Sequence, residues 1–170
     1  MGTLAFQAYA GPLGIRLGGR PLMTQDVDFA NRGADRHHGK PAKMKALASA
    51  GAQPLRHLDF LIHQPERSVL LFGGGVPVTI PRAERFAVYK LIVAVERADQ
   101  AKSAKDIMRA GMLFEALARK RPLELASAWQ VAWDTGRRWR EKLAAGRERL
   151  PAAARDILTR TIERPRAVRR

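Results

Sequence analysis

The sequence predicts an α+β fold, with strands and helices in the first half of the chain and helices alone in the second. Before Pro81, short apolar runs are bounded by Gly, Pro and polar residues, which is the pattern of short strands and turns. After Pro81, apolar residues recur with the 3.6-residue period of helices. The length of 170 residues suits one domain, or one small domain with an appended lobe. We therefore expect a core at 1–81, a helical lobe at 82–163 and a basic tail at 164–170.

The core is expected to contain both helices and strands. Its elements are, in order, a helix at 4–13, a strand at 27–30, a short helix at 43–49, a strand at 58–63, and two strands at 68–72 and 76–80. The last two strands flank Gly73-Gly74-Gly75, which suits a hairpin with a loose turn. The triple glycine is not a phosphate-binding P-loop, because no Lys-Ser or Lys-Thr pair follows it.

The lobe is expected to consist of helices at 82–98, 101–119, 123–144 and 151–163. Gly136 and Gly146 are candidate breaks in the third helix, and Pro151 is a typical first residue for the last. Trp129 and Trp133 are i, i+4 neighbours, a spacing that favours packing in the core of the lobe. The alternative is a nucleic acid surface, formed by these aromatic residues and by the arginines at 137, 138 and 140.

The charge of the chain predicts an anionic partner. The net charge is +15, and residues 101–170 hold 18 of the 31 Lys and Arg residues. Basic surfaces attract nucleic acids and gain affinity by releasing counterions from phosphates, although a general bias toward arginine would give the same composition. No run of 18 apolar residues and no secretory signal is found, and cysteine is absent. These features predict a cytoplasmic protein with no membrane partner.

Three aspartates form the most informative pattern. Asp26 and Asp28 stand in Thr-Gln-Asp-Val-Asp-Phe, and residues i and i+2 of a strand point to the same face. Asp59 stands in a second expected strand, as Leu-Asp-Phe-Leu. Two adjacent carboxylates repel each other unless a cation lies between them, and carboxylate oxygens suit Mg²⁺. The three residues therefore predict a metal site for phosphoryl or nucleotidyl transfer.

Several segments together resemble a known family. They are Gly2-Thr3 before an apolar helix, the T-x-D-h-D pattern at 24–28, the F-A-h-x-K-L pattern at 86–91, and Arg97 with Lys105-Asp106. The chain is similar, from residue 2 to about 150, to a bacterial family of nucleotidyltransferase-fold proteins of the DNA-polymerase-β-like superfamily, related to AbiE-type toxins of toxin–antitoxin systems. The resemblance implies a polymerase-β-like core, in which helices cover a small mixed sheet.

The resemblance also implies roles for individual residues. Gly2 and Thr3 would contact nucleotide phosphates, Lys90 would be a phosphate-binding cation, and Asp106 would support the nucleotide site. Asp26, Asp28 and Asp59 would be the catalytic, Mg²⁺-binding carboxylates. The alternatives are an exposed Lys90 on an amphipathic helix and an ordinary acid at Asp106 in the first turn of its helix. In the superfamily a strand precedes the Gly-Thr pair. Because Met1 stands directly before Gly2, the core is expected to lack that strand.

These inferences predict Mg²⁺-dependent transfer of a nucleotide from an NTP to a hydroxyl or phosphate acceptor. RNA or another nucleic acid is a candidate acceptor, and an antitoxin protein is a candidate partner. The alternative function is that of a degenerate, catalytically weak nucleotidyltransferase. Such a protein would act as a module that binds nucleotide, nucleic acid or an antitoxin. The missing first strand and the basic lobe both motivate this alternative.

Overall fold

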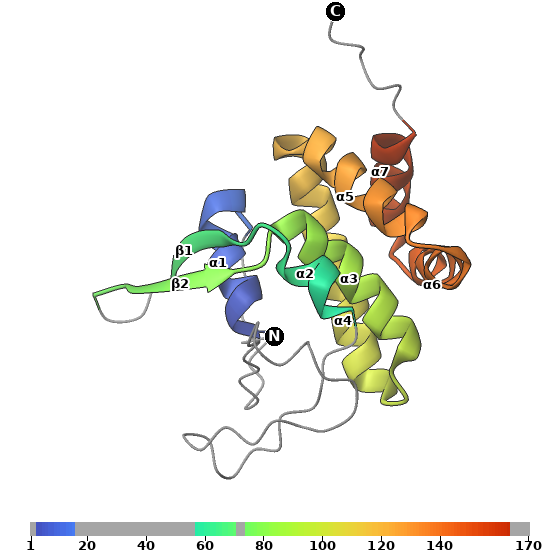
Figure 1. The fold of residues 1–170 in the computed structure, drawn as a ribbon, viewed down its shortest axis with the longest axis horizontal. Helices are drawn as coiled ribbons and strands as arrows, with labels where there is room; N and C mark the ends of the chain where they lie inside the picture. The colour runs from blue at the N-terminus through green and yellow to red at the C-terminus, as the bar shows by residue number, and fades with distance from the viewer. Residues whose placement is uncertain (1–2, 16–56, 71–73, 164–170) are drawn as a thin grey trace, which may run out of the picture.

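The structure is a computed structural model that describes residues 3–15, 57–70 and 74–163. The elements before the lobe are the helix α1 (Thr3–Leu13), the helix α2 (Leu58–Ile62) and the strands β1 (Glu66–Leu70) and β2 (Val76–Ile80). The lobe consists of α3 (Ala83–Glu96), α4 (Gln100–Lys120), α5 (Pro122–Asp134), α6 (Arg137–Glu148) and α7 (Ala152–Ile162). The described part of the chain thus confirms an α+β fold with mostly helical content (Figure 1).

Helix α3 is the centre of the fold. It packs against α4, α5 and α6, while α7 covers α4 and α5, and α2 lies along α3 (Figure 1). Ten of its residues are buried, including Phe86, Leu91 and Ile92, which have no exposed surface. A helix that is apolar on most of its circumference must be enclosed by other elements, and α3 is enclosed in this way. No described helix is long and apolar enough to cross a membrane.

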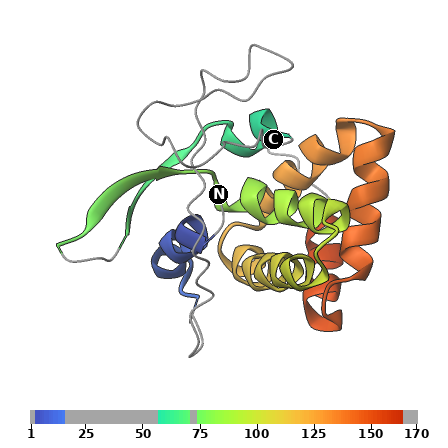
Figure 2. The same ribbon diagram turned by 90° about the horizontal axis from the view of Figure 1, so that it is seen from below.

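The two strands form an antiparallel hairpin that projects away from the helices (Figure 2). Glu66 pairs with Ile80 and Leu70 pairs with Val76. The hairpin is joined to α1, because Ser68 Oγ donates a hydrogen bond to the carbonyl of Ala8 at 3.4 Å. This hairpin was predicted from the sequence, and its sheet is the only one among the described residues. A mixed sheet and a polymerase-β-like core stay predictions, as does the domain boundary at 81.

Helix α1 is fixed to the chain segment that enters α3. The hydroxyl of Tyr9 donates a hydrogen bond to the carbonyl of Pro81 at 2.5 Å, and the Tyr9 side chain is buried. Burial raises the pKa of Tyr9 well above its usual value, with a smaller contribution from Glu66 and Glu84. The phenol therefore stays neutral and keeps its proton for this bond. The helix itself was predicted from the sequence, at 4–13.

The strand predicted at 58–63 is wrong, because residues 58–62 form the short helix α2. Its helical turn buries Leu58, Phe60 and Leu61 and leaves Asp59 exposed. The ring of Phe60 meets the ring of Trp139 edge-on, with centroids 5.2 Å apart. The strand predicted at 27–30 and the helix predicted at 43–49 lie outside the described residues.

The third helix of the lobe is divided at one of the two predicted glycines. Gly136 has a φ of 135°, in a region that favours glycine, and it separates α5 from α6. Gly146 does not interrupt α6, since it lies inside that helix. A Cβ atom at position 146 would stand 3.0 Å from both the Cβ atom and the carbonyl oxygen of Leu91. Gly146 thus allows α6 to approach the backbone of α3.

Gly146→Ala is expected to lower the free energy of unfolding by about 1–2 kcal/mol, because overpacking of a tight contact outweighs the gain in helix propensity. Gly11 in α1 is the matched control, since a Cβ atom there would meet nothing within 4 Å. Gly11→Ala is expected to stabilise the fold by up to about 1 kcal/mol. Urea unfolding followed by circular dichroism measures both values. Equal stabilisation by the two substitutions would contradict a close approach of α6 to α3.

Candidate functional site

A buried ion-pair cluster joins the helices α3 and α4. The ammonium of Lys90 lies 2.7 Å from Oδ1 of Asp106, and Nε of Arg97 lies 2.6 Å from Oδ2 of the same carboxylate. Lys90 and Asp106 are 2% and 3% exposed, so both charges are removed from water. Each carboxylate oxygen therefore accepts one charge-assisted hydrogen bond, the stronger class of hydrogen bond in proteins.

Both ordinary interpretations of these two residues are wrong. Lys90 is not an exposed lysine, because it lies among the buried residues of α3. Asp106 is not in the first turn of its helix, because α4 begins at Gln100 and is capped by Asp99, whose side chain accepts a hydrogen bond from the amide of Lys102. Burial lowers the pKa of Lys90, and the neighbouring Asp106 opposes this shift. The carboxylate thus favours the charged form of a desolvated ammonium.

The cluster extends to the beginning of α1. The guanidinium of Arg109, one turn beyond Asp106, lies 5.7 Å from the centre of the Phe6 ring. Phe6 is one turn beyond Thr3, the first residue of α1. The structure therefore brings the start of α1 toward the part of α4 that carries Asp106. Burial lowers the pKa of Arg109, the charge of Asp106 opposes this shift, and the positive charge of Arg97 adds to it.

Arg97 is the member of the cluster that reaches solvent. Its side chain is 37% exposed, whereas those of Lys90 and Asp106 are 3% and 4% exposed. Only its Nε is hydrogen-bonded to a described residue, so the two terminal nitrogens are available to a ligand. A guanidinium held in this way can donate two parallel hydrogen bonds to a phosphate. Sequence reasoning matched Arg97 to a family pattern but did not assign it to the site.

Helix α2, which carries Asp59, lies along α3. His57, directly before α2, has its Nε2 3.5 Å from Oε1 of Glu96, the last residue of α3. Glu96 also forms an ion pair with Lys142 of α6. His57 thus lies toward the end of α3 that is followed by Arg97, whereas Phe60 lies toward the first turn of α3, where Arg85 donates a hydrogen bond to its carbonyl at 3.0 Å. Asp59 is exposed and makes no ion pair with another described residue.

The other predicted site residues are not placed. Gly2, Asp26 and Asp28 lie outside the described residues, and of Thr3 only the backbone is described, as the first residue of α1. Within the described ranges, no group of three or more His, Asp or Glu residues is arranged to hold a metal ion. The three-aspartate metal site therefore stays a prediction, with Asp59 as its one described member.

A second ion-pair network connects the hairpin with α3 and α5. Arg121 lies 2.9 Å from Glu66 and 3.3 Å from Glu84. Glu84 is buried at 2% exposure, and its Oε2 is 3.6 Å from Nε of Arg82. Arg82 and Glu84, with Leu123 and Ser127, line a pocket of about 320 Å³. The network joins elements distant in sequence and contains no residue predicted for the nucleotide site.

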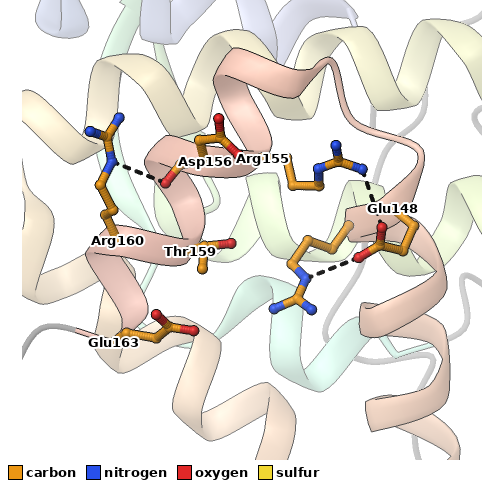
Figure 3. Close-up of a pocket in the computed structure, with 7 residues that line it drawn as sticks. Glu148, Arg155, Asp156, Thr159, Arg160 and Glu163 are labelled. Atoms are coloured by element: carbon orange, nitrogen blue, oxygen red, sulfur yellow. Dashed lines mark hydrogen bonds and ion pairs between the residues drawn. The ribbon is translucent and has the colours of Figure 1, made fainter.

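A larger open pocket, of about 460 Å³, lies between α6 and α7 (Figure 3). Its charges neutralise one another. Arg155 is 3.2 Å from Oε2 of Glu148, and Arg160 donates a hydrogen bond to the carbonyl of Asp156 at 3.3 Å. Three arginines and three acidic residues line the pocket, so its wall has no excess charge. It is a solvated groove between helices rather than an anion site.

The cluster around Asp106 has the composition of an anion-binding site, because it holds an ordered and partly exposed guanidinium beside two buried cations. A family model described as a nucleotidyltransferase matches the chain over residues 1–36 and 30–134. These segments span most of the chain, which therefore belongs to this nucleotidyltransferase family. No curated protein and no solved structure has significant similarity to the chain.

Proposed function

We propose that the protein transfers a nucleotide from an NTP to a hydroxyl or phosphate acceptor in a Mg²⁺-dependent reaction. The observation that carries this proposal is the partly exposed Arg97, whose side chain is held by the buried carboxylate of Asp106. Helix α2, which packs against α3, presents Asp59 to solvent. An exposed guanidinium and an exposed carboxylate suit the two parts of the substrate, its phosphates and its metal ion. Membership of a nucleotidyltransferase family supports the same reaction class.

In this proposal the cluster binds the triphosphate. Arg97 donates hydrogen bonds to the phosphates, together with the backbone at Gly2 and Thr3. Lys90 acts through Asp106, because its ammonium is 2.7 Å from that carboxylate and is closed to solvent. Asp106 is thus a positioning residue, which fixes the direction of the Arg97 side chain. Preorganised charges of this kind stabilise the transition state without reorganising during the reaction.

The carboxylates of Asp26, Asp28 and Asp59 would hold the metal. Carboxylate oxygens are the ligands that Mg²⁺ prefers, and the exposed Asp59 is open to such an ion. Bound Mg²⁺ would neutralise charge on the pyrophosphate that leaves and favour ionisation of the attacking hydroxyl. Asp59 would accept the proton of that hydroxyl. One bond forms between the acceptor oxygen and the α-phosphorus, and the bond from the α-phosphorus to the bridging oxygen breaks.

The test is a transfer assay with metal removal. The chain is incubated with each α-³²P-labelled NTP, Mg²⁺ and total RNA, and label is followed in RNA, in protein and in small acceptors. We expect label transfer with at least one NTP, and its loss to background when EDTA removes the metal, since the carboxylates alone cannot neutralise the leaving pyrophosphate. Tight NTP binding without any label transfer would instead support the degenerate alternative.

A further inference from the structure

Positive charge is dense on helix α6 of the lobe, which holds within 12 residues as many Lys and Arg residues as α4 holds within 21. α6 carries five Lys or Arg residues and two Glu residues within 137–148. The adjacent helix α5, of similar length, carries two acidic residues and no Lys or Arg. A general bias toward arginine would supply cations to both helices. The difference between them therefore indicates a specific surface on α6.

Three exposed arginines surround the first turn of α6, and we call this surface the arginine turn (Arg137, Arg138 and Arg140). Trp139 between them faces the interior and is 8% exposed. Arg137 is held by Glu141, with Nε 2.8 Å from its carboxylate. Arg138 and Arg140 form no ion pair with any residue in the described ranges, so their charges are open to a partner.

The arginine turn stands where cations are electrostatically unfavourable. The first turn of a helix carries the positive end of the helix dipole, which favours acidic residues there and disfavours basic ones. The first turn of α6 has no acidic residue, and its N-cap Gly136 provides no side-chain hydrogen bond. A chain that places unpaired arginines in this position gives up stability in the free protein. Such local conflicts are typical of functional surfaces.

The groove between α6 and α7 shows the opposite arrangement. Its arginines are bonded to Glu148 and to the backbone of α7, as Figure 3 shows for Arg155 and Arg160. The arginine turn and this groove therefore differ in character. One is neutralised by its own acids, and the other is not.

The arginine turn lies beside α2. The ring of Trp139 meets His57 and Phe60 edge-on, with centroids 4.7 Å and 5.2 Å away. α2 also carries the exposed Asp59, a member of the predicted metal site. A polyanion on the outer side of the arginine turn would therefore run close to that site.

We propose that the arginine turn is the docking surface for a nucleic acid acceptor, whose backbone phosphates contact Arg138 and Arg140. This inference rests on the proposed function and specifies its acceptor. Arginine favours phosphate, because its planar guanidinium matches two phosphate oxygens at once. A nucleic acid supplies phosphates at regular intervals, which suits separate arginines around one helical turn. An acidic protein is the rival partner, and the test includes it.

The test compares two double variants with the same loss of charge. One is Arg138→Gln with Arg140→Gln, and the control is Arg155→Gln with Arg160→Gln in the neutralised groove. Binding of a fluorescein-labelled, mixed-sequence single-stranded RNA is measured by anisotropy over a series of KCl concentrations. The first variant is expected to bind roughly tenfold more weakly at low salt. Its slope of log affinity against log salt should fall by about 0.7 for each phosphate contact removed.

Further measurements distinguish three causes of weaker RNA binding: loss of this surface, loss of folding and loss of total positive charge. Thermal unfolding of the first variant is expected at the same or a higher temperature, because unfavourable cations leave the helix start. An equal loss of RNA binding in both variants would overturn the proposal, since total charge would then be the cause. Unchanged binding in the first variant would also overturn it. So would competition by polyglutamate as effective as competition by unlabelled RNA at equal charge.

The transfer assay distinguishes this inference from the proposed function. Loss of RNA binding in the first variant, with no label transfer by the parent chain, would support RNA docking on the arginine turn and contradict the proposed nucleotide transfer. Label transfer to small acceptors only, with RNA binding unaffected by the two substitutions, would contradict RNA docking on the arginine turn and support the proposed nucleotide transfer.

Discussion

Asp106→Asn is expected to lower the free energy of unfolding by about 3–5 kcal/mol, the cost of removing one partner of a buried ion pair. The substitution keeps the size of the side chain but leaves the ammonium of Lys90, 2% exposed, without a counter-charge at 2.7 Å. Small domains have a total stability of about 5–15 kcal/mol, so this loss is a large part of it. Urea unfolding followed by circular dichroism measures the change.

A second substitution distinguishes the effect of charge on stability from the effect of side-chain shape. Asp106→Asn combined with Lys90→Met removes the paired charges of Lys90 and Asp106 and keeps an unbranched chain of similar length at position 90. This double variant should recover most of the lost stability, because Arg97 is partly solvated and does not need the carboxylate to the same extent. A loss below about 1 kcal/mol in Asp106→Asn alone would mean that Lys90 reaches water or another acid.

The single variant should also acquire a characteristic pH dependence. Burial already lowers the pKa of Lys90 in the folded protein, and loss of Asp106 lowers it further. Below the folded pKa the buried charge destabilises the variant, and this cost disappears as pH rises toward the pKa of an unfolded lysine, about 10.4. In that window the unfolded chain binds more protons, so stability rises with pH. Compared with the parent chain, Asp106→Asn should therefore regain stability in mildly alkaline buffer.

The helical lobe and the hairpin could be predicted because their signals are local. The amphipathic period from residue 83 onward extends over several turns in each helix, and the hairpin strands flank a glycine-rich turn. Helix α2 could not be predicted in the same way. Five apolar-rich residues fit a strand and a helix equally well, and packing decides between them. Here, the contact of Phe60 with Trp139 and the left-handed backbone of His57, with a φ of 64°, accompany the helix.

Part of the candidate site was visible in the sequence, but the division of roles was not. The pattern around Lys90 and Asp106 marked both residues, and the structure places them together. Sequence spacing does not show that the lysine pairs with the aspartate inside the fold, or that Arg97 remains as the exposed cation. These relations depend on how α3 and α4 pack. The burial of a basic residue on a packed helix must therefore be known before a ligand is assigned to it.

Asp59→Asn is expected to lower the rate of nucleotide transfer by about 100- to 1,000-fold with little change in stability. A metal-binding carboxylate contributes several kcal/mol to transition-state stabilisation, and each 1.36 kcal/mol is a factor of ten in rate. The fold has little need of this side chain, because it is exposed and has no ion-pair partner among the described residues. Its place in the first turn of α2 contributes at most about 1 kcal/mol.

The matched control is Asp134→Asn, which changes another exposed aspartate, at the end of α5. Its only described side-chain partner is Gln130, which lies on the same helix, and it lies far along the chain from the predicted metal site. The control should keep both rate and unfolding temperature. Because Mg²⁺ would be held partly by Asp59, excess Mg²⁺ should restore some of the lost rate in Asp59→Asn, and this rescue would not occur for a residue that only supports α2. Equal rates in Asp59→Asn and the control would exclude Asp59 from the metal site and leave Asp26 and Asp28 as its predicted carboxylates.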